Sequence, residues 1–151
     1  MRKSFFVLVC LMLLTGCGER SPYDTESVSG TVLVDGAPMQ GISIIFSPVK
    51  PDEGHAAGSV TDADGKYKLT TAGLDIGSGA VSGTYNVTFR KIEIIGNDLS
   101  MEEAEEKYPN GLPVIYHVPK KYENHDTSGI EPVTVEKKKK NVFDFNLSTK
   151  D

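Results

Sequence analysis

The stretch SVTDADGKYKLTT is the part of the sequence whose residue types and spacing come closest to a metal site. Asp62, Asp64 and Gly65 have a spacing that calcium-binding loops use. An EF-hand loop would also need an oxygen ligand two residues after Asp64 and a glutamate at its twelfth position, between two helices. Lys66 and Gly73 occupy those positions. We therefore interpret the stretch as a turn closed by Gly65, with weak calcium binding by Asp62 and Asp64 as the alternative.

A second group of candidate ligands lies in a segment rich in tyrosine and histidine. Its members are Tyr108, Tyr116, His117, Tyr122 and His125. His55 is the remaining histidine, and the separations of 62 and 8 residues between the three histidines form no metal-ligand spacing by themselves. A metalloenzyme that uses this segment is one hypothesis. The sequence contains no nucleophile elbow, P-loop or glycine-rich dinucleotide loop, so we favour a protein without catalytic residues, cofactor or metal.

Residues 1–16 have the pattern of a signal peptide. Arg2 and Lys3 are positively charged, and the apolar run FFVLVCLMLL that follows is short for a bilayer span. The run ends in LLTGC, which resembles a bacterial lipobox. In that motif the cysteine thiol takes a diacylglyceryl thioether before cleavage, so we predict that Cys17 is lipidated and becomes the mature N-terminus. An ordinary secretory signal and an uncleaved anchor are the alternatives.

The composition of the remaining chain limits its partners. Cys10 lies in the leader and Cys17 would carry lipid, so the mature domain has no free thiol and no disulfide. Removing residues 1–16 leaves 14 Lys and Arg against 21 Asp and Glu, and the formal charge moves from −5 to −7. An acidic domain is a poor partner for nucleic acid or for bare anionic lipid. Membrane attachment must then come from the acyl chains on Cys17.

The body of the chain alternates in polarity as β-strands do. Residues 17–26 are polar and read as a lipidated tether, which leaves residues 27–151 as one domain. Apolar residues recur at every second position in several segments. These sets are Val28, Gly30, Val32 and Val34; Ile42, Ile44 and Phe46; Tyr67 and Leu69; Tyr85, Val87 and Phe89; Val133 and Val135; Phe143, Phe145 and Leu147. With the weaker segment AAGSVTD they predict seven strands in two sheets packed face to face.

Two connections carry distinct turn chemistry. The sequence DGAP, residues 35–38, is predicted to join the first two strands, with Gly36 free to take a positive φ. The sequence EKKKKN lies between the last two predicted strands. Its lysines could form a basic patch, but we interpret them as the solvated tip of a hairpin.

The turn and strand signals together resemble the carboxypeptidase regulatory-like domain, of the transthyretin-like (prealbumin-like) sandwich class. The matching residues are Gly30, Thr31, Val32, Gly36, Pro38, Gly41, Thr61, Asp62, Asp64, Gly65, Tyr67 and Leu69. The segment SGTYNVTF resembles the next strand of that family, and the chain from VPKKY to NVFDFNL resembles its small bacterial lipoprotein members. The resemblance covers residues 27–148. It implies an all-β, seven-stranded antiparallel Greek-key sandwich, secretion or surface display, and no catalytic residues to carry over.

Two enzyme classes share this sandwich class, and the sequence departs from both. Intradiol dioxygenases use two tyrosines and two histidines to bind iron, but the closely spaced histidine pair is missing here. Hydrolases that act on hydroxyisourate end in a tyrosine-arginine-glycine-serine motif, whereas this chain ends in NLSTKD. The resemblance therefore favours a non-catalytic member.

Residues 92–126 are far longer than a hairpin loop. Within them, SMEEAEEKYP predicts one short helix over residues 101–107, capped by Ser100 with Glu103 completing a capping box and Pro109 following its end. A long ordered loop is where a specific function would lie. The alternative is an insertion that lies on the flank of the sandwich.

These features lead to one expected function and one alternative. We expect a non-catalytic, lipid-anchored protein of the bacterial cell envelope, with its domain outside the cytoplasm. Its role would be structural, adhesive or ligand-binding, with an envelope protein or a carbohydrate as partner and no nucleic acid. The alternative is a metalloenzyme that uses the tyrosines and histidines of residues 92–126.

Overall fold

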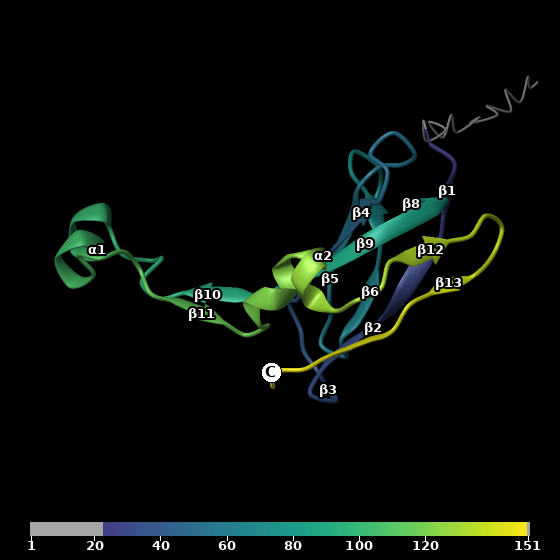
Figure 1. Ribbon diagram of the computed structural model, residues 1–151. Coiled ribbons are helices and arrows are strands. Elements are labelled where there is room, and N and C mark those ends of the chain that lie inside the picture. The colour runs from purple at the N-terminus through teal and green to yellow at the C-terminus, as the bar shows by residue number, and fades with distance from the viewer. Residues whose placement is uncertain (1–22, 151) are drawn as a thin grey trace, which may run out of the picture.

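The computed structural model describes residues 23–150, and the fold is mostly β (Figure 1). The first nine strands are β1 (Thr25–Glu26), β2 (Val28–Val34), β3 (Ala37–Pro38), β4 (Ser43–Pro48), β5 (Ala57–Val60), β6 (Lys66–Lys68), β7 (Thr70–Thr71), β8 (Ala80–Val81) and β9 (Gly83–Arg90). The others are β10 (Ile92–Ile94), β11 (Val114–Tyr116), β12 (Val133–Val135), β13 (Asn141–Val142) and β14 (Phe145–Leu147). The helices are α1 (Met101–Lys107), the 3₁₀ helix η1 (Lys120–Glu123) and α2 (His125–Ser128).

Two packed sheets form the body of the protein. The first is antiparallel, with the strand order β12-β9-β4-β5-β7, and the second is built around β2. Ser29 of β2 pairs with both Lys68 of β6 and Val142 of β13, so β2 lies between these two strands. β14 continues the register of β13 along β2, and β3 pairs with the end of β2. The two-sheet arrangement predicted from the alternating polarity is confirmed.

The direction of one strand pair corrects the prediction of an antiparallel sandwich. β13 and β14 run parallel to β2. Antiparallel neighbours can be joined by a tight hairpin, whereas parallel neighbours need a long connection. Here nearly the whole domain lies between β2 and β13 in sequence, so no hairpin constrains their relative direction.

The core lies between the sheets and consists mainly of the residues predicted by the period-two pattern. The fully buried large side chains are Val28, Val32, Ile42, Ile44, Phe46, Leu69, Tyr85, Val87, Phe89, Val118, Val135 and Leu147. The ring centroid of Phe46 lies 6.0 Å from that of Tyr85 and 6.1 Å from that of Phe143. Burial raises the pKa of the Tyr67 and Tyr85 hydroxyls, and each hydroxyl donates a hydrogen bond to a backbone carbonyl, as buried phenols require.

Gly30 lets the C-terminal strand approach β2 closely. A Cβ atom at Gly30 would lie 1.8 Å from the carbonyl oxygen of Phe143. That oxygen accepts a hydrogen bond from the Tyr67 hydroxyl at 2.8 Å. The next residue, Asp144, accepts a hydrogen bond from the backbone N–H of Thr31 at 2.8 Å through its side chain. The pairing of β2 with the C-terminal strand is interrupted between β13 and β14. There the Asp144 side chain replaces a backbone acceptor.

The DGAP turn joins different strands from those predicted. DGAP does form a tight turn, with positive φ at Asp35 (50°) and Gly36 (83°), but it leads only to the two-residue β3. β4 belongs to the other sheet. Positive φ at both central residues is the geometry of a type I′ hairpin turn, so the local chemistry was predicted correctly and the partner strand was not.

The lysine-rich segment is also placed differently, and the hairpin interpretation is wrong. β12 pairs with β9, whereas β13 pairs with β2, so the segment crosses from one sheet to the other. The buried Asn141 side chain holds this crossing, because it accepts a hydrogen bond from the backbone N–H of Glu136 at 2.8 Å and donates to the carbonyls of Glu136 and Lys139. The four lysines remain exposed.

The helix count was underestimated. Besides α1, the chain forms η1 and α2 in the last part of the predicted long loop and just beyond it, and both contact β9. Tyr122 of η1 is buried, and its hydroxyl accepts a hydrogen bond from the backbone N–H of Ser148 at 2.9 Å. Arg90 at the end of β9 forms an ion pair with Glu123 at 3.1 Å. Residues 117–130 therefore belong to the sandwich and not to a free insertion.

Candidate functional site

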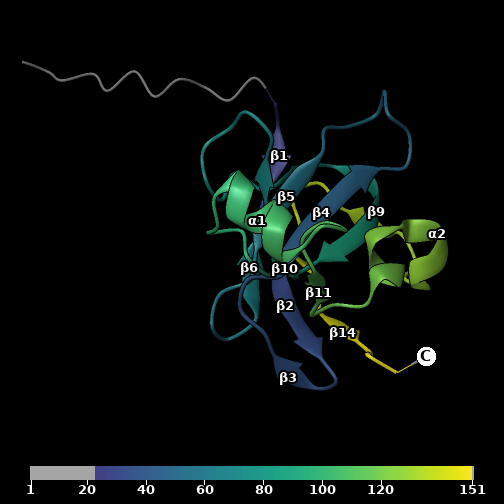
Figure 2. The same ribbon diagram turned by 90° about the vertical axis from the view of Figure 1, so that its left-hand side faces the viewer.

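Residues 92–116 form an arm that projects from the sandwich (Figure 1). Its ribbon consists of β10 and β11, which pair antiparallel from Ile92 with Tyr116 to Ile94 with Val114. Helix α1 lies at the far end of the ribbon. Viewed from the arm side, α1 lies in front of the sheets (Figure 2). We call this segment the arm from here on.

The base of the arm is tied to the sandwich at Lys91. The backbone N–H of His117 donates to the Lys91 carbonyl at 2.9 Å, and the Lys91 Nζ donates to the carbonyl of Gln40 at 2.6 Å. The His117 Nε2 lies 3.0 Å from a carboxylate oxygen of Glu93 across the ribbon. These contacts hold the beginning of β10 and the end of β11 against the body of the protein.

The tip of the arm is a capped helix, as the sequence predicts. The backbone N–H of Glu103 donates to the Ser100 hydroxyl at 3.3 Å, and the Glu103 carboxylate accepts from the backbone N–H of Ser100 at 3.0 Å. Both the hydroxyl and the backbone of Ser100 donate to the Glu103 carboxylate and lower its pKa. The capping box and the helix bounds of 101–107 are confirmed.

A small apolar contact joins the helix to the ribbon. A Cβ atom at Gly96 would lie within 3.4 Å of side-chain atoms of Tyr108, Leu99 and Leu112. Gly96 has a φ of 83°. These three side chains are partly exposed, and no residue of the arm is buried. The arm thus has its own small cluster and contributes nothing to the core of the sandwich.

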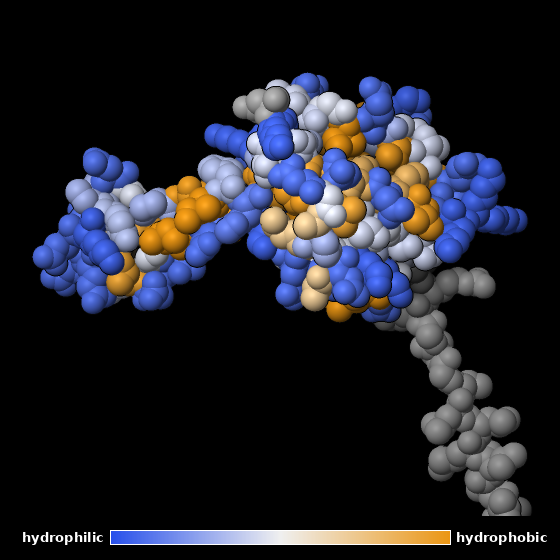
Figure 3. Space-filling view, turned by 90° about the horizontal axis from the view of Figure 1, so that it is seen from below, coloured by the Kyte–Doolittle hydropathy of each residue, from blue (hydrophilic) through white to orange (hydrophobic). Residues whose placement is uncertain are grey.

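The arm carries an unusual share of exposed apolar surface. Half of the ten exposed large apolar side chains among the described residues belong to it: Ile94, Met101, Val114, Ile115 and Tyr116. Met101 is 88% exposed. In Figure 3 apolar surface runs along the ribbon between the hydrophilic tip and the sandwich. Contiguous apolar surface of this kind marks interaction sites in soluble domains.

The arm is also strongly acidic. It contains six carboxylates, Glu93, Asp98, Glu102, Glu103, Glu105 and Glu106, against one lysine, Lys107. All seven side chains belong to exposed residues. The arm carries a formal excess of five negative charges, most of them at its tip beside the apolar ribbon. This field favours a partner surface that combines apolar groups with positive charge.

A groove of about 650 Å³ lies on the outer face of the sheet around β2. Ser29 and Thr31 line its floor, because they alternate with the inward-facing Val28 and Val32. Val60, Ile76 and Val142 supply exposed apolar surface, and Lys66, Lys68 and Lys140 supply positive charge. We call this feature the groove.

Comparisons with known proteins identify no family for this chain. No protein-family model matches the sequence, and no curated protein matches it. Among solved structures, a "putative adhesin" from Bacteroides ovatus matches with 20% sequence identity and a TM-score of 0.42. The match covers 90% of this chain and 49% of that one, so this chain spans about half the length of the solved structure. Likeness at this level carries neither a fold nor a function from one protein to the other.

The acidic stretch that opened the sequence analysis forms the predicted turn. The Asp62 side chain accepts hydrogen bonds from the backbone N–H groups of Asp64 at 2.9 Å and Lys66 at 2.8 Å. Gly65 has a φ of 73°, and its N–H donates to the Asp62 carbonyl at 3.0 Å. The turn joins β5 to β6, which lie in different sheets. The Asp64 side chain is exposed and forms an ion pair with Lys66 at 3.2 Å.

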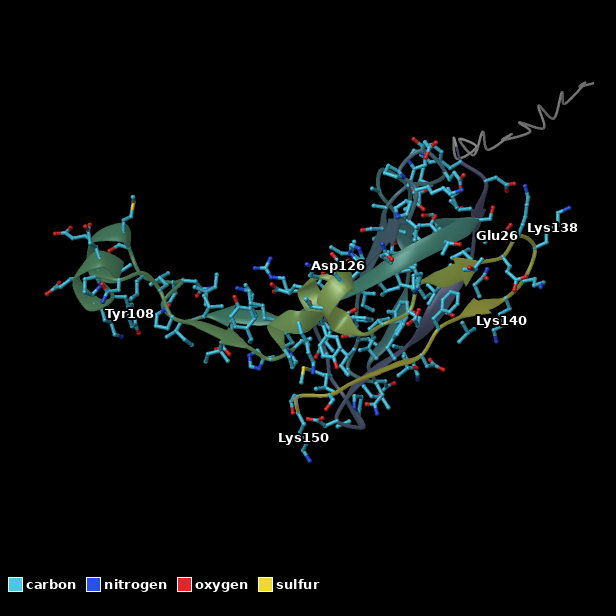
Figure 4. The ribbon with its side chains drawn as sticks, viewed as in Figure 1. Glu26, Tyr108, Asp126, Lys138, Lys140 and Lys150 are labelled. Atoms are coloured by element: carbon cyan, nitrogen blue, oxygen red, sulfur yellow. The ribbon has the colours of Figure 1, made fainter. Side chains whose placement is uncertain are left out.

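The tyrosines and histidines of the long loop have separate environments. Tyr108 lies at the tip of the arm, whereas α2, with His125 beside Asp126, lies against the sandwich (Figure 4). Tyr122 packs into the core, and His117 pairs with Glu93. Among residues 23–150, no three histidine, cysteine or acidic side chains are grouped to hold a metal ion.

The predicted lipidation site, Cys17, lies outside the described residues. In residues 23–150, none of the helices has the length and hydropathy that a membrane crossing requires. The remaining histidine, His55, lies with its ring centroid 3.9 Å from that of Tyr23, at the beginning of the described chain.

Proposed function

We propose that the protein is a non-catalytic, lipid-anchored module of the bacterial cell envelope that binds a partner protein through the arm. The observation that carries this proposal is the composition of the arm, where five large apolar side chains stay exposed on a projection that adds nothing to the core. Leaving apolar area in water is unfavourable, so such a surface is maintained where a partner covers it.

The stability of the arm supports the same proposal. A two-stranded ribbon is marginally stable on its own, and a helix of seven residues is too short to be stable without other contacts. Within the arm, the cluster around Gly96 and the capping box at Ser100 hold these elements together. A partner that covered the ribbon would also stabilise it.

The position of β1 agrees with display of the arm away from a membrane. Thr25 lies eight positions after Cys17, and an extended chain covers about 3.5 Å per position, so β1 would lie within about 28 Å of the lipid. β1 and the arm lie on opposite sides of the sandwich (Figure 1). A lipid on Cys17 would therefore hold the β1 side near the membrane and leave the arm free to reach a partner.

The topology supports assignment of the domain to the prealbumin-like class. β6 and β7 are separated by Leu69 alone, and β13 and β14 by two residues. β6 pairs with β2 and β7 pairs with β5, so the first of these pairs passes from one sheet to the other. Counting each pair as one interrupted strand, together with β2, β4, β5, β9 and β12, gives seven strands. We include in the proposal that residues 27–151 form a Greek-key sandwich of the carboxypeptidase regulatory-like type, in which β13 and β14 follow β2 in parallel.

Site-specific photo-cross-linking tests the role of the arm. A photoreactive phenylalanine analogue is placed at Ile115 on the arm or at Ile45 on β4, in the full chain expressed in a bacterial envelope. These two isoleucines are matched, with exposed fractions of 45% and 46%. We expect a protein adduct of defined mass from position 115 and none from position 45. Equal adduct yields at the two positions, or none at either, would refute an arm made for binding.

A further inference from the structure

The groove and the arm carry the three most exposed apolar side chains among the described residues. Ile76 is 99% exposed and Val60 is 62% exposed, and both line the groove. Met101, at 88%, begins α1 on the arm. The other seven exposed large apolar side chains reach at most 46%. The most solvent-exposed apolar side chains are therefore concentrated on two features of the same chain, the arm and the groove.

The groove has positive charge to offer a partner. Lys68 and Lys140 form no ion pair or hydrogen bond through their side chains with other described residues. Within residues 23–150, the Lys66 ammonium pairs with the exposed Asp64 alone. Two carboxylates, Asp62 and Asp144, also line the groove and keep their charge while they accept hydrogen bonds from backbone N–H groups. Against the three lysines they leave a formal excess of one positive charge.

The arm complements the groove in both respects. It presents exposed apolar side chains beside carboxylates that outnumber its single lysine by five. Apolar contact supplies most of the affinity of an interface, while complementary charge selects the partner and its orientation.

We infer that the arm of one copy docks into the groove of a second copy. This inference rests on the proposed function and names the partner of the arm as the same protein. The apolar side chains near Met101 and along the ribbon cover Val60, Ile76 and Val142, while the glutamates of α1 face Lys68 and Lys140.

The two surfaces lie on different parts of the molecule, so the contact is heterologous. The tip of the arm at Tyr108 and the lysine at position 140 lie at opposite ends of the view in Figure 4. A contact between different surfaces leaves one arm and one groove free at each end of a pair. Such contacts extend into rings or open chains and do not stop at a dimer.

Cysteine cross-linking tests this geometry in the full chain. The native cysteines are Cys10 and Cys17, both within the leader and lipobox. The variant Met101→Cys, Ile76→Cys carries one reactive thiol on the arm and one in the groove, and a short bis-maleimide is added to cells. We expect a ladder of covalent dimers, trimers and larger species. Each single-cysteine variant can give at most a dimer, and the wild type should give none.

Charge reversal separates docking from chance proximity. In the double-cysteine chain, Lys68→Glu with Lys140→Glu should reduce the ladder at least tenfold, because carboxylates then face carboxylates. Adding Glu105→Lys and Glu106→Lys to the same chain should restore it. All four positions are exposed, and equal melting temperatures would show that the fold is unchanged. Failure of the second pair of substitutions to restore the ladder would overturn the assigned contact.

The outcomes also separate this inference from the proposed function. If the double-cysteine chain gives no more than its single-cysteine parents while position 115 still cross-links to another protein, self-docking is wrong and the binding role of the arm stands. If position 115 gives no adduct either, both are wrong. A ladder together with a position 115 adduct of twice the chain mass supports both.

Discussion

Two glycines show how single residues determine the contacts of this sandwich. Gly30 leaves room for the Phe143 carbonyl between β2 and the C-terminal strand, and Gly65 closes the turn that links the two sheets. Either residue could be read from the sequence only as part of a pattern. The alternating pattern placed Gly30 on the inner face but could not show which backbone atom fills the space of its missing side chain.

Substitution of Gly30 tests the close approach of the C-terminal strand. Gly30→Ala should reduce the free energy of unfolding by about 3 kcal/mol or more, because backbone cannot move aside as a side chain can. Gly36→Ala is the matched control: nothing lies within 4 Å of its Cβ, and only its φ of 83° is unfavourable, at a cost of about 1–2 kcal/mol. Urea unfolding of both variants measures the difference, and equal losses would contradict the packing at Phe143.

The Asp62 turn gives a second test at this scale. Gly65→Ala should destabilise the domain by at least about 1–2 kcal/mol, because φ is 73° and a Cβ would lie 2.5 Å from the Val32 carbonyl oxygen. Asp64→Asn should cost little, because its side chain is exposed. Thermal melting with calcium and with chelator distinguishes a turn from a metal site. A calcium-dependent rise that Asp64→Asn removes would show that the stretch is a calcium site.

Helix α1 is the element whose prediction succeeded most fully. Its signals are local: Ser100 and Glu103 interact within one turn, and Pro109 follows the end. The ribbon that carries the helix was missed. The segment IEII alternates over only three residues before two isoleucines follow each other, and PVIY holds apolar residues on neighbouring positions, so the period-two pattern was too short to identify these strands. Their pairing depends on a partner strand some 20 residues away, which local patterns do not specify.

The cap predicts a pH dependence confined to the arm. Hydrogen bonds from Ser100 lower the pKa of Glu103 in the folded helix relative to an unfolded chain. This stabilisation is fully present above the ordinary glutamate pKa of about 4.3, and it is lost as the pH falls through the lower, folded value. NMR shifts of α1 should therefore move toward random coil in acid before the core unfolds.

A conservative variant provides the control for this titration. Glu103→Gln cannot ionise, so the acid-dependent change in α1 attributable to this cap should disappear, while core resonances such as those of Phe46 should behave as in the wild type. Loss of α1 and the core at the same pH would contradict the independence of the arm from the sandwich.

At the scale of the whole molecule, the sequence predicted the class of fold better than the pairing and order of its strands. Buried faces depend on local polarity, and most of the predicted core residues are buried, while Val133, Phe143 and Phe145 are partly buried and pack against the core. Strand partners depend on contacts between distant segments, so the lysine-rich crossing was mistaken for a hairpin and the parallel pairing of β13 was missed. The groove could not be anticipated, because Lys68 and Lys140 come together only when β6 and β13 flank β2.

Lipidation of Cys17 is the prediction on which attachment of the protein to a membrane depends. Intact-mass and peptide mass spectrometry of the membrane-extracted protein should find an acylated Cys17 as the first residue. Cys17→Ser should release the domain from the membrane fraction, because no other source of attachment is predicted for an acidic domain. A product cleaved at another bond and without acyl chains would disprove the anchor.

The central claim is that the arm is a binding surface. Its most direct test is the solvent accessibility of the arm in cells. Ile115→Cys and Ile45→Cys have matched exposure, and a membrane-permeant maleimide can label each in cells and in dilute purified protein. We predict that position 115 is labelled at least tenfold more slowly in cells than after purification, while position 45 reacts equally in both. Equal labelling of position 115 in the two settings would contradict the account.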